Sequence, residues 1–148
     1  GFSDADIDRM VREAEENGKG LGEMGQLRDA LFSLTLYARS PDGVDPAAVL
    51  EGLQRDRTLF EKVPGTAMEC AFGHLHSYSS NYYTYMWSLV ISKDFFGQFE
   101  DDLMSSELAR RYRDAVLARG GADDAQDLVR TFLGRDSSFD AWEAWLRS

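Results

Sequence analysis

Apolar residues recur at three- and four-residue spacing along most of this chain, a pattern typical of helices with one buried face. This spacing predicts a first helix that begins at Ser3 and a second helix over Glu23–Ala38. Further helices are predicted from Pro46 through Leu53 and over Ser106–Arg119, Asp123–Leu133 and Ser138–Ser148. We find no convincing strand pattern, so the sequence predicts an all-α fold of about six or seven helices.

Local signals mark where several of these helices begin and end. Asp6 follows Ser3 by three residues, as in a capping box, and Asp45-Pro46 is a pair that caps and opens a helix. Three glycines are expected to end the first helix: Gly18, Gly20 and Gly22. In the second helix we expect one apolar stripe to face the core, formed by Met24, Leu27, Leu31, Leu34 and Thr35.

Two consecutive segments break this amphipathic pattern. Residues Phe60–Ser80 have no clear period, so we expect a long loop, which in a compact protein is usually functional. Residues Asn81–Phe99 are predicted to form one helix that is apolar on nearly every side, apart from a polar stripe of Asn81, Thr84, Ser88 and Ser92. A helix of this kind is expected in the interior of a protein rather than on its surface.

Composition limits the classes of partner. At 148 residues and 43% hydrophobic content the chain can bury one core, so residues 1–148 are predicted to form a single domain. A net charge of −10 argues against nucleic acid and anionic membranes as partners, and fits neutral or cationic peptides better. The longest apolar run, Tyr85–Ile91, is far shorter than the roughly 20 residues of a membrane span. Cys70 is the single cysteine and cannot form an internal disulfide, so we expect a cytoplasmic location.

Residues 72–87 contain both histidines, four of the six tyrosines and one of the three tryptophans. These side chains carry polar groups on apolar rings, so burying them together would leave many donors and acceptors in need of partners. A substrate is one source of partners; the alternative is an aromatic core helix that satisfies its own polar groups. If the helix begins near Ser79, then Tyr78, Tyr82 and Tyr85 lie at i, i+4 and i+7 and point the same way. Tyr83 and Trp87 then point elsewhere, and core packing is their expected role.

Several motifs, taken in order, give a resemblance to a known family. Phe72-Gly73-His74-Leu75, a short loop, Tyr78, and then Tyr82-Tyr83-Thr84-Tyr85-Met86-Trp87 form the central stretch. It resembles the C-terminal catalytic segment of the thimet oligopeptidase family of zinc metallopeptidases, which includes neurolysin, oligopeptidase A and the bacterial dipeptidyl carboxypeptidases. Four other stretches are also similar to that family: Asn17–Leu21, Leu31–Tyr37, Phe60–Thr66 and Leu117–Gly121. The resemblance therefore covers nearly the whole chain.

The resemblance implies zinc chemistry whose ligands this chain lacks. The family holds zinc with H-E-x-x-H on a helix and a more distant Glu, and the Glu of the motif is the general base. No such motif is present here, and the chain starts at Gly1 rather than Met. We therefore expect the C-terminal part of a longer peptidase, or the small chain of a split one, which binds no zinc by itself. The expected partners are a peptide substrate, the missing N-terminal part, and further copies of the chain through exposed apolar surface.

The resemblance also assigns roles to four side chains. Tyr85 would donate a hydrogen bond to the carbonyl oxygen that gains charge in the transition state, and His74 would contact the substrate, so these two are the candidate catalytic residues. Tyr78 and Tyr82 are the candidate substrate-binding residues. Family members commonly have a glycine-rich loop between the His and the first Tyr, which lets that loop close over the substrate. Here Leu75, His76 and Ser77 stand in its place, and they are less permissive in backbone angle.

Three alternatives remain open. The chain could be a non-catalytic helical domain that binds peptides or proteins and keeps the fold without the chemistry. The stretch Gly20–Gly25 satisfies G-x-G-x-x-G, but it follows a helix rather than a strand, so a break between helices is favoured over dinucleotide binding. His74 and His76 form an H-x-H pair that could bind a metal, although hydrogen bonding is the favoured role.

Overall fold

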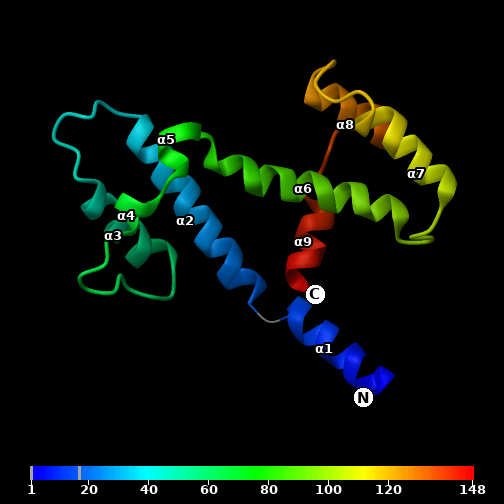
Figure 1. The fold of residues 1–148 in the computed structure, drawn as a ribbon, viewed down its shortest axis with the longest axis horizontal. Helices are drawn as coiled ribbons and strands as arrows, with labels where there is room; N and C mark the ends of the chain where they lie inside the picture. Colours follow the sequence, from blue (N-terminus) through cyan, green and yellow to red (C-terminus); the bar gives the residue numbers. More distant parts are fainter. Residues whose placement is uncertain (1, 17) are drawn as a thin grey trace. The chain divides into compact units, whose positions relative to one another are not determined.

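The fold is all-α. The structure is a computed structural model that describes residues 2–16 and 18–148. Every regular element in these two ranges is a helix, and nine of them are α-helices (Figure 1). This confirms the all-α prediction, with a few more helices than expected. The chain divides into two compact units, Gly1–Met86 and Trp87–Ser148. The assignment of residues 1–148 to one domain stays a prediction.

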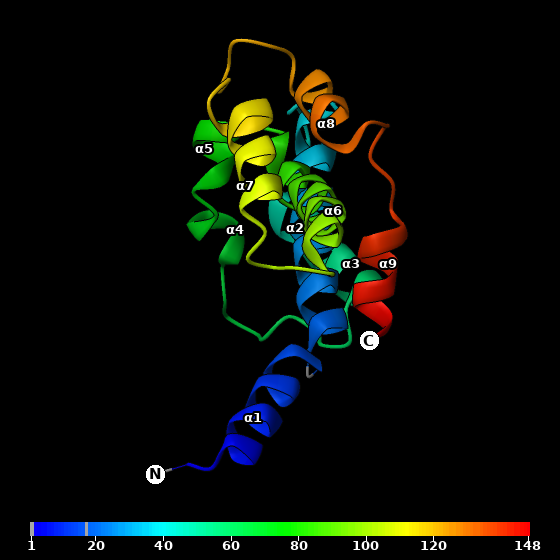
Figure 2. The same ribbon diagram turned by 90° about the vertical axis from the view of Figure 1, so that its right-hand side faces the viewer.

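The first unit is built around one long helix, α2. Its elements are α1 (Asp4–Glu16), α2 (Lys19–Tyr37), α3 (Pro46–Arg57), α4 (Met68–Ala71), α5 (His74–Tyr78) and the 3-10 turn η1 (Asn81–Tyr83). Helix α2 packs against both α3 and η1, and α2 and α3 lie side by side in both views (Figures 1 and 2). Phe32 on α2 and Leu50 on α3 are 0% and 2% exposed. The core of this unit therefore lies where these helices meet.

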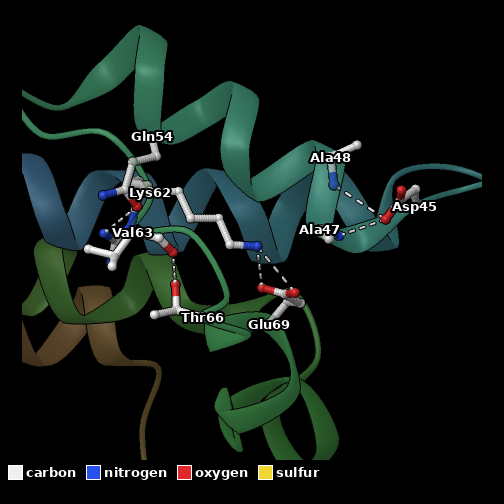
Figure 3. Close-up of polar contacts among 9 residues, drawn as sticks. Asp45, Ala47, Ala48, Gln54, Lys62, Val63, Thr66 and Glu69 are labelled. Carbon is white, nitrogen blue, oxygen red and sulfur yellow. Dashed lines mark hydrogen bonds and ion pairs between the residues drawn. The ribbon is translucent and has the colours of Figure 1, made fainter.

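Side-chain caps begin two helices of the first unit, as predicted. The Asp6 amide donates to Ser3 Oγ at 3.2 Å, and the Ser3 amide donates to the Asp6 carboxylate at 3.1 Å, which completes a capping box. At α3, the Asp45 carboxylate accepts from the amides of Ala47 and Ala48 at 2.9 and 3.3 Å (Figure 3). These bonds satisfy amides that have no partner within the first turn of a helix.

An ion pair with little exposure fixes the segment between α3 and α4. Lys62 Nζ lies 3.3 and 3.2 Å from the two carboxylate oxygens of Glu69 (Figure 3), and the two side chains are 17% and 11% exposed. Nearby, Thr66 Oγ1 donates to the carbonyl of Val63 at 2.7 Å. Polar contacts therefore shape this segment, while Leu59, Phe60 and Val63 remain more than half exposed.

The predicted start of α2 and its predicted buried stripe are both wrong. Gly18 alone takes a left-handed conformation, with φ of 88°, whereas Gly20 and Gly22 lie inside α2. The G-x-G-x-x-G stretch is thus the interior of a helix and not a phosphate-binding turn. The notebookless stripe pattern also misleads about the face: Leu27 and Leu34 are 46% and 39% exposed, and the buried residues of α2 are Asp29, Ala30, Phe32 and Ser33.

Two short helices replace part of the predicted loop over Phe60–Ser80. Helices α4 and α5 have four and five residues, which is too short for an apolar period to be visible in the sequence. His74 and His76, which we expected on a loop, both lie on α5. Of the stretches that resemble the thimet oligopeptidase family, only Asn17 lies outside the described residues.

The second unit begins within α6 (Thr84–Phe96), which starts in the first unit. Its other elements are η2 (Gly97–Phe99), α7 (Ser106–Tyr112), the π-helical turn η3 (Arg113–Leu117), α8 (Ala125–Leu133) and α9 (Asp140–Arg147). Phe132 is 2% exposed and lies against three other aromatic rings, those of Phe95, Phe99 and Tyr112. Gly134 ends α8 with φ of 75°, as predicted.

One charged group is buried in the second unit. Asp94 of α6 is 3% exposed and accepts two hydrogen bonds from the Arg135 guanidinium, at 2.8 and 2.5 Å. It also accepts from the amide of Ser138 at 2.9 Å. The hydrogen bonds from Arg135, opposed by burial and helped by the Ser138 amide, lower the pKa of Asp94. This carboxylate therefore ties α6 to the segment between α8 and α9.

Helix α6 with its flanking 3-10 turns matches the predicted Asn81–Phe99 helix, but its expected burial is wrong for this chain. Only Val90 and Asp94 of α6 are buried, whereas Trp87 and Phe96 are 50% and 54% exposed. Within the described residues, few side chains cover this helix. None of the helices described here has the length and apolar character that crossing a bilayer requires.

Candidate functional site

A sharp backbone change shapes the aromatic segment between α5 and α6. Helix α5 ends at Tyr78, and Ser79 follows with φ of 52° and ψ of −118°. The chain then enters η1, which carries Tyr82, and continues into α6, which carries Tyr85. Tyr78 therefore does not share a helix with Tyr82 and Tyr85, and the predicted i, i+4, i+7 register is wrong at its first position.

The imidazole of His74 nevertheless brings all three tyrosines together. Its ring centroid lies 5.4 Å from that of Tyr78, 5.1 Å from that of Tyr82 and 5.5 Å from that of Tyr85. The rings of Tyr82 and Tyr85 are 5.1 Å apart and meet edge to face, as aromatic pairs prefer. The four candidate residues form one cluster, centred on His74, which we call the His74 cluster.

A short hydrogen bond joins the two candidate catalytic residues. His74 Nε2 and the Tyr85 hydroxyl are 2.7 Å apart. Tyr78 and Tyr85 are 60% and 51% exposed, so the cluster faces solvent in this chain and is accessible to a ligand. The alternative of an aromatic core that satisfies its own polar groups does not fit this exposure.

Tyr82 occupies the most enclosed part of the His74 cluster. Burial raises the pKa of the Tyr82 phenol above its usual value, and the charge of Asp29 and the neighbouring Tyr85 raise it further. Arg28 and a hydrogen bond with Gln26 act in the opposite direction. A raised pKa keeps the phenol protonated at neutral and mildly alkaline pH, so Tyr82 remains a hydrogen-bond donor there.

The sequence analysis did not find the residues of α2 that support this cluster. Phe32 stacks on Phe72 with ring centroids 6.1 Å apart, and Phe72 in turn meets Tyr82 at 4.9 Å. Ser33 Oγ donates to the carbonyl of Ser79, and the Tyr37 hydroxyl donates to that of Leu75, both at 2.6 Å. Polar residues four apart within an apolar helix, such as Ser33 and Tyr37, are the signal that could have indicated this.

The two residues expected to pack in the core do not do so here. Tyr83 is 46% exposed and Trp87 is 50% exposed, although Trp87 contacts the ring of Phe139 with centroids 5.7 Å apart. Core packing is therefore the wrong interpretation of both residues in this chain. No hydrogen bond joins the Tyr83 hydroxyl to another described residue, which makes Tyr83 a natural control for Tyr85.

The described residues do not fit a zinc ion. Over residues 2–16 and 18–148, no three side chains of His, Cys, Asp or Glu lie close enough together to hold a metal. His74 is hydrogen-bonded to Tyr85, and His76 is exposed on α5 without further ligands beside it. The chemistry available from the His74 cluster itself is hydrogen bonding and aromatic contact.

Comparison with known proteins places the chain in a family. The sequence model of Peptidase family M3 matches residues 3–148. Saccharolysin of Saccharomyces cerevisiae is 43% identical over 142 residues, and oligopeptidase A of Escherichia coli is 32% identical over 142 residues. These matches cover 92% and 91% of this chain but only 20% of each relative, so the chain spans about a fifth of their length. The mitochondrial intermediate peptidase of Pleurotus djamor is 34% identical over 108 residues, or 70% of this chain and 14% of that protein. These matches confirm the resemblance noted in the sequence, and the chain belongs to peptidase family M3, a family of zinc metallopeptidases.

Proposed function

We propose that this chain is the substrate-side part of the catalytic domain of a zinc metallopeptidase that hydrolyses short peptides. In this proposal the His74 cluster forms one wall of the peptide channel, and the zinc-binding part lies outside this chain. The observation that carries the proposal is the hydrogen bond between Tyr85 and His74, at the centre of an exposed ring cluster in a member of a peptidase family. A cytoplasmic location remains part of the proposal.

Tyr85 is proposed to stabilise charge that develops on the substrate. When water adds to a peptide carbonyl, negative charge builds on the carbonyl oxygen, and a fixed donor aimed at that oxygen lowers the barrier. If His74 carries its proton on Nε2, it donates to the Tyr85 oxygen, and the phenol hydrogen is then free to point at the substrate. His74 would thus orient the Tyr85 hydroxyl and polarise it.

Tyr78 and Tyr82 are proposed to hold the peptide beside Tyr85. Tyr78 is 60% exposed and lies against His74, so its ring and hydroxyl can contact a bound chain. Tyr82 stays protonated because its pKa is raised, and it can donate to a peptide carbonyl. No step of this mechanism uses a metal, because the described residues of this chain do not fit one.

A non-catalytic peptide-binding domain is the second candidate. The exposed rings of the His74 cluster favour it, because aromatic side chains with polar tips are common in binding surfaces. The two candidates differ in what they require elsewhere in the protein. An H-E-x-x-H sequence upstream of this stretch in the gene, or in a co-purifying chain, supports the peptidase, and its absence from both supports the binding domain.

Hydrolysis by the full-length protein tests the proposal directly. We expect the product of the parent gene to cleave a quenched fluorescent peptide, and a chelator to stop the cleavage. A full-length protein that binds the same peptide but leaves it intact, with zinc supplied, would refute the peptidase in favour of the binding domain. A labelled, uncleavable peptide should also shift its anisotropy less when Tyr78 is replaced by Ala than when Tyr83 is.

A further inference from the structure

We propose that Ser33 and Tyr37 of α2 are positioning residues for the His74 cluster. Each hydroxyl donates to a backbone carbonyl of the segment that carries His74 and Tyr78. The effect on hydrolysis rests on the proposed function, whereas the effect on the backbone of the segment does not. The inference assigns a task to two residues of α2 that touch neither zinc nor the reacting groups.

Ser33 holds the end of the segment. Its side chain is 0% exposed, and its Oγ donates to the carbonyl of Ser79 at 2.6 Å across 46 positions of sequence. A buried hydroxyl has no water to bond, so this carbonyl is the partner that satisfies it. Removing the hydroxyl would also leave the Ser79 carbonyl without its donor. The bond therefore fixes where the chain leaves Tyr78.

Tyr37 holds the start of the same segment. Its hydroxyl donates to the carbonyl of Leu75, the residue after His74, at 2.6 Å. Ser33 and Tyr37 lie four apart on α2, so they occupy the same face on successive turns. Their two acceptors lie within and just after α5 (His74–Tyr78). One face of α2 thus grips α5 near both of its ends.

The backbone at Ser79 explains why such a grip is needed. Ser79 is the sole non-glycine residue with positive φ in the part of the chain that the structure describes. At φ of 52° and ψ of −118° its Cβ is crowded, and such strain persists only when surrounding contacts impose it. The Ser33 bond accepts at this residue and is the contact that imposes it. A chain with glycine here would adopt the same turn without help.

The grip has a consequence for the candidate site. The ring of His74 reaches Tyr85 at 2.7 Å only if α5 stays in place relative to α6. Phe32 beneath Phe72 supports the segment from the apolar side, and the two hydroxyls fix its backbone. Loss of either hydroxyl should therefore loosen α5 and weaken the contact between His74 and Tyr85, while both residues remain present.

Hydrogen exchange and kinetics on the full-length protein test the proposal. In Ser33→Ala and Tyr37→Phe, we expect amide exchange across residues 72–83 to rise roughly two- to tenfold, since one net hydrogen bond is lost in each. In the same variants kcat should fall by a similar factor, with KM changed less. Tyr37 is 51% exposed and Phe keeps its ring, so this variant should fold even if Ser33→Ala does not.

Two matched controls and one rescue sharpen the test. Ser92→Ala removes a hydroxyl that donates to the Leu89 carbonyl of its own helix at 2.8 Å, and Tyr83→Phe removes a hydroxyl of similar exposure; neither should change exchange across 72–83 by more than about twofold. Adding Ser79→Gly to Ser33→Ala should recover part of kcat, because glycine adopts the turn without strain.

The outcomes separate this proposal from the proposed function. Unchanged exchange in both Ser33→Ala and Tyr37→Phe would overturn the positioning role. Unchanged kcat in an active enzyme, despite faster exchange, would also overturn it. If the wild-type protein hydrolyses no peptide, the proposed function fails, and exchange across residues 72–83 alone then decides whether α2 holds the segment.

Discussion

Replacing Tyr85 with Phe removes one hydroxyl and keeps the ring in the His74 cluster. The change deletes the 2.7 Å bond to His74 Nε2 but preserves the ring contacts with His74 and Tyr82, at 5.5 and 5.1 Å. Because Tyr85 is 51% exposed, water can replace the lost partner of His74. The cost in stability should be at most about 1 kcal/mol, which lowers Tm by roughly 2 to 4 °C.

The effect on turnover should be much larger than the effect on stability. A donor aimed at charge that develops in the transition state is worth about 3 kcal/mol, or roughly a hundredfold in rate. The loss should appear in kcat with little change in KM, since the hydroxyl bonds the substrate oxygen mainly in the transition state. Steady-state hydrolysis of a quenched fluorescent peptide by the full-length protein measures both constants.

Tyr83→Phe is the matched control for this measurement. Tyr83 lies two positions away, is 46% exposed against 51% for Tyr85, and makes no hydrogen bond to another described residue. It should change kcat less than twofold, about the effect of an unpaired surface hydroxyl. Equal losses at the two positions, or a Tyr85 defect confined to KM, would show that the cluster contributes packing or ground-state binding instead of catalysis.

Three further predictions concern the chain itself. The purified chain should hold no stoichiometric zinc and cleave no peptide, and elemental analysis that finds one tightly bound zinc, with chelator-sensitive hydrolysis, would contradict this. It should self-associate in sedimentation experiments through exposed apolar side chains such as Trp87 and Phe96; a monodisperse monomer over a wide concentration range that binds no hydrophobic dye would count against this. Asp94→Asn should lower the free energy of unfolding by roughly 2 kcal/mol, because it weakens charged hydrogen bonds from Arg135, which is itself half exposed. Since the folded state lowers the pKa of Asp94, this stabilisation is present above about pH 4 and is lost as pH falls through the folded pKa, so urea titrations of Asp94→Asn should show a smaller acid loss than wild type.

Local chemistry made some helix ends predictable from sequence. The capping box of Ser3 and Asp6 and the cap at Asp45 depend on side chains within three residues of the amides they satisfy, so spacing alone identifies them. Gly134 likewise ends α8 through its own backbone angle. Gly20 and Gly22 were misread because glycine permits a break in a helix but does not require one, and the neighbouring turns kept α2 intact.

Features that depend on distant residues were missed. Helix α5 is too short to show a period, and what holds it is contact with α2, more than 30 positions away in sequence. The buried face of α2 was assigned to the wrong side because Asp29 and Ser33, two polar residues, lie on it. Ser33 is buried there because Ser79 offers it an acceptor, which no single-residue scale of hydrophobicity can anticipate.

The site residues were found for a reason that the structure partly replaces. A shared helical register was expected to align Tyr78, Tyr82 and Tyr85, yet the chain turns at Ser79 and breaks that register. The tyrosines still meet because α5 places His74 among them. Convergence of this kind depends on the turn at Ser79, where a non-glycine residue is held at positive φ, and so on the buried hydroxyl of Ser33. A chain that lacks glycine in this segment can therefore present the same four rings, provided that a neighbouring helix supplies the constraint.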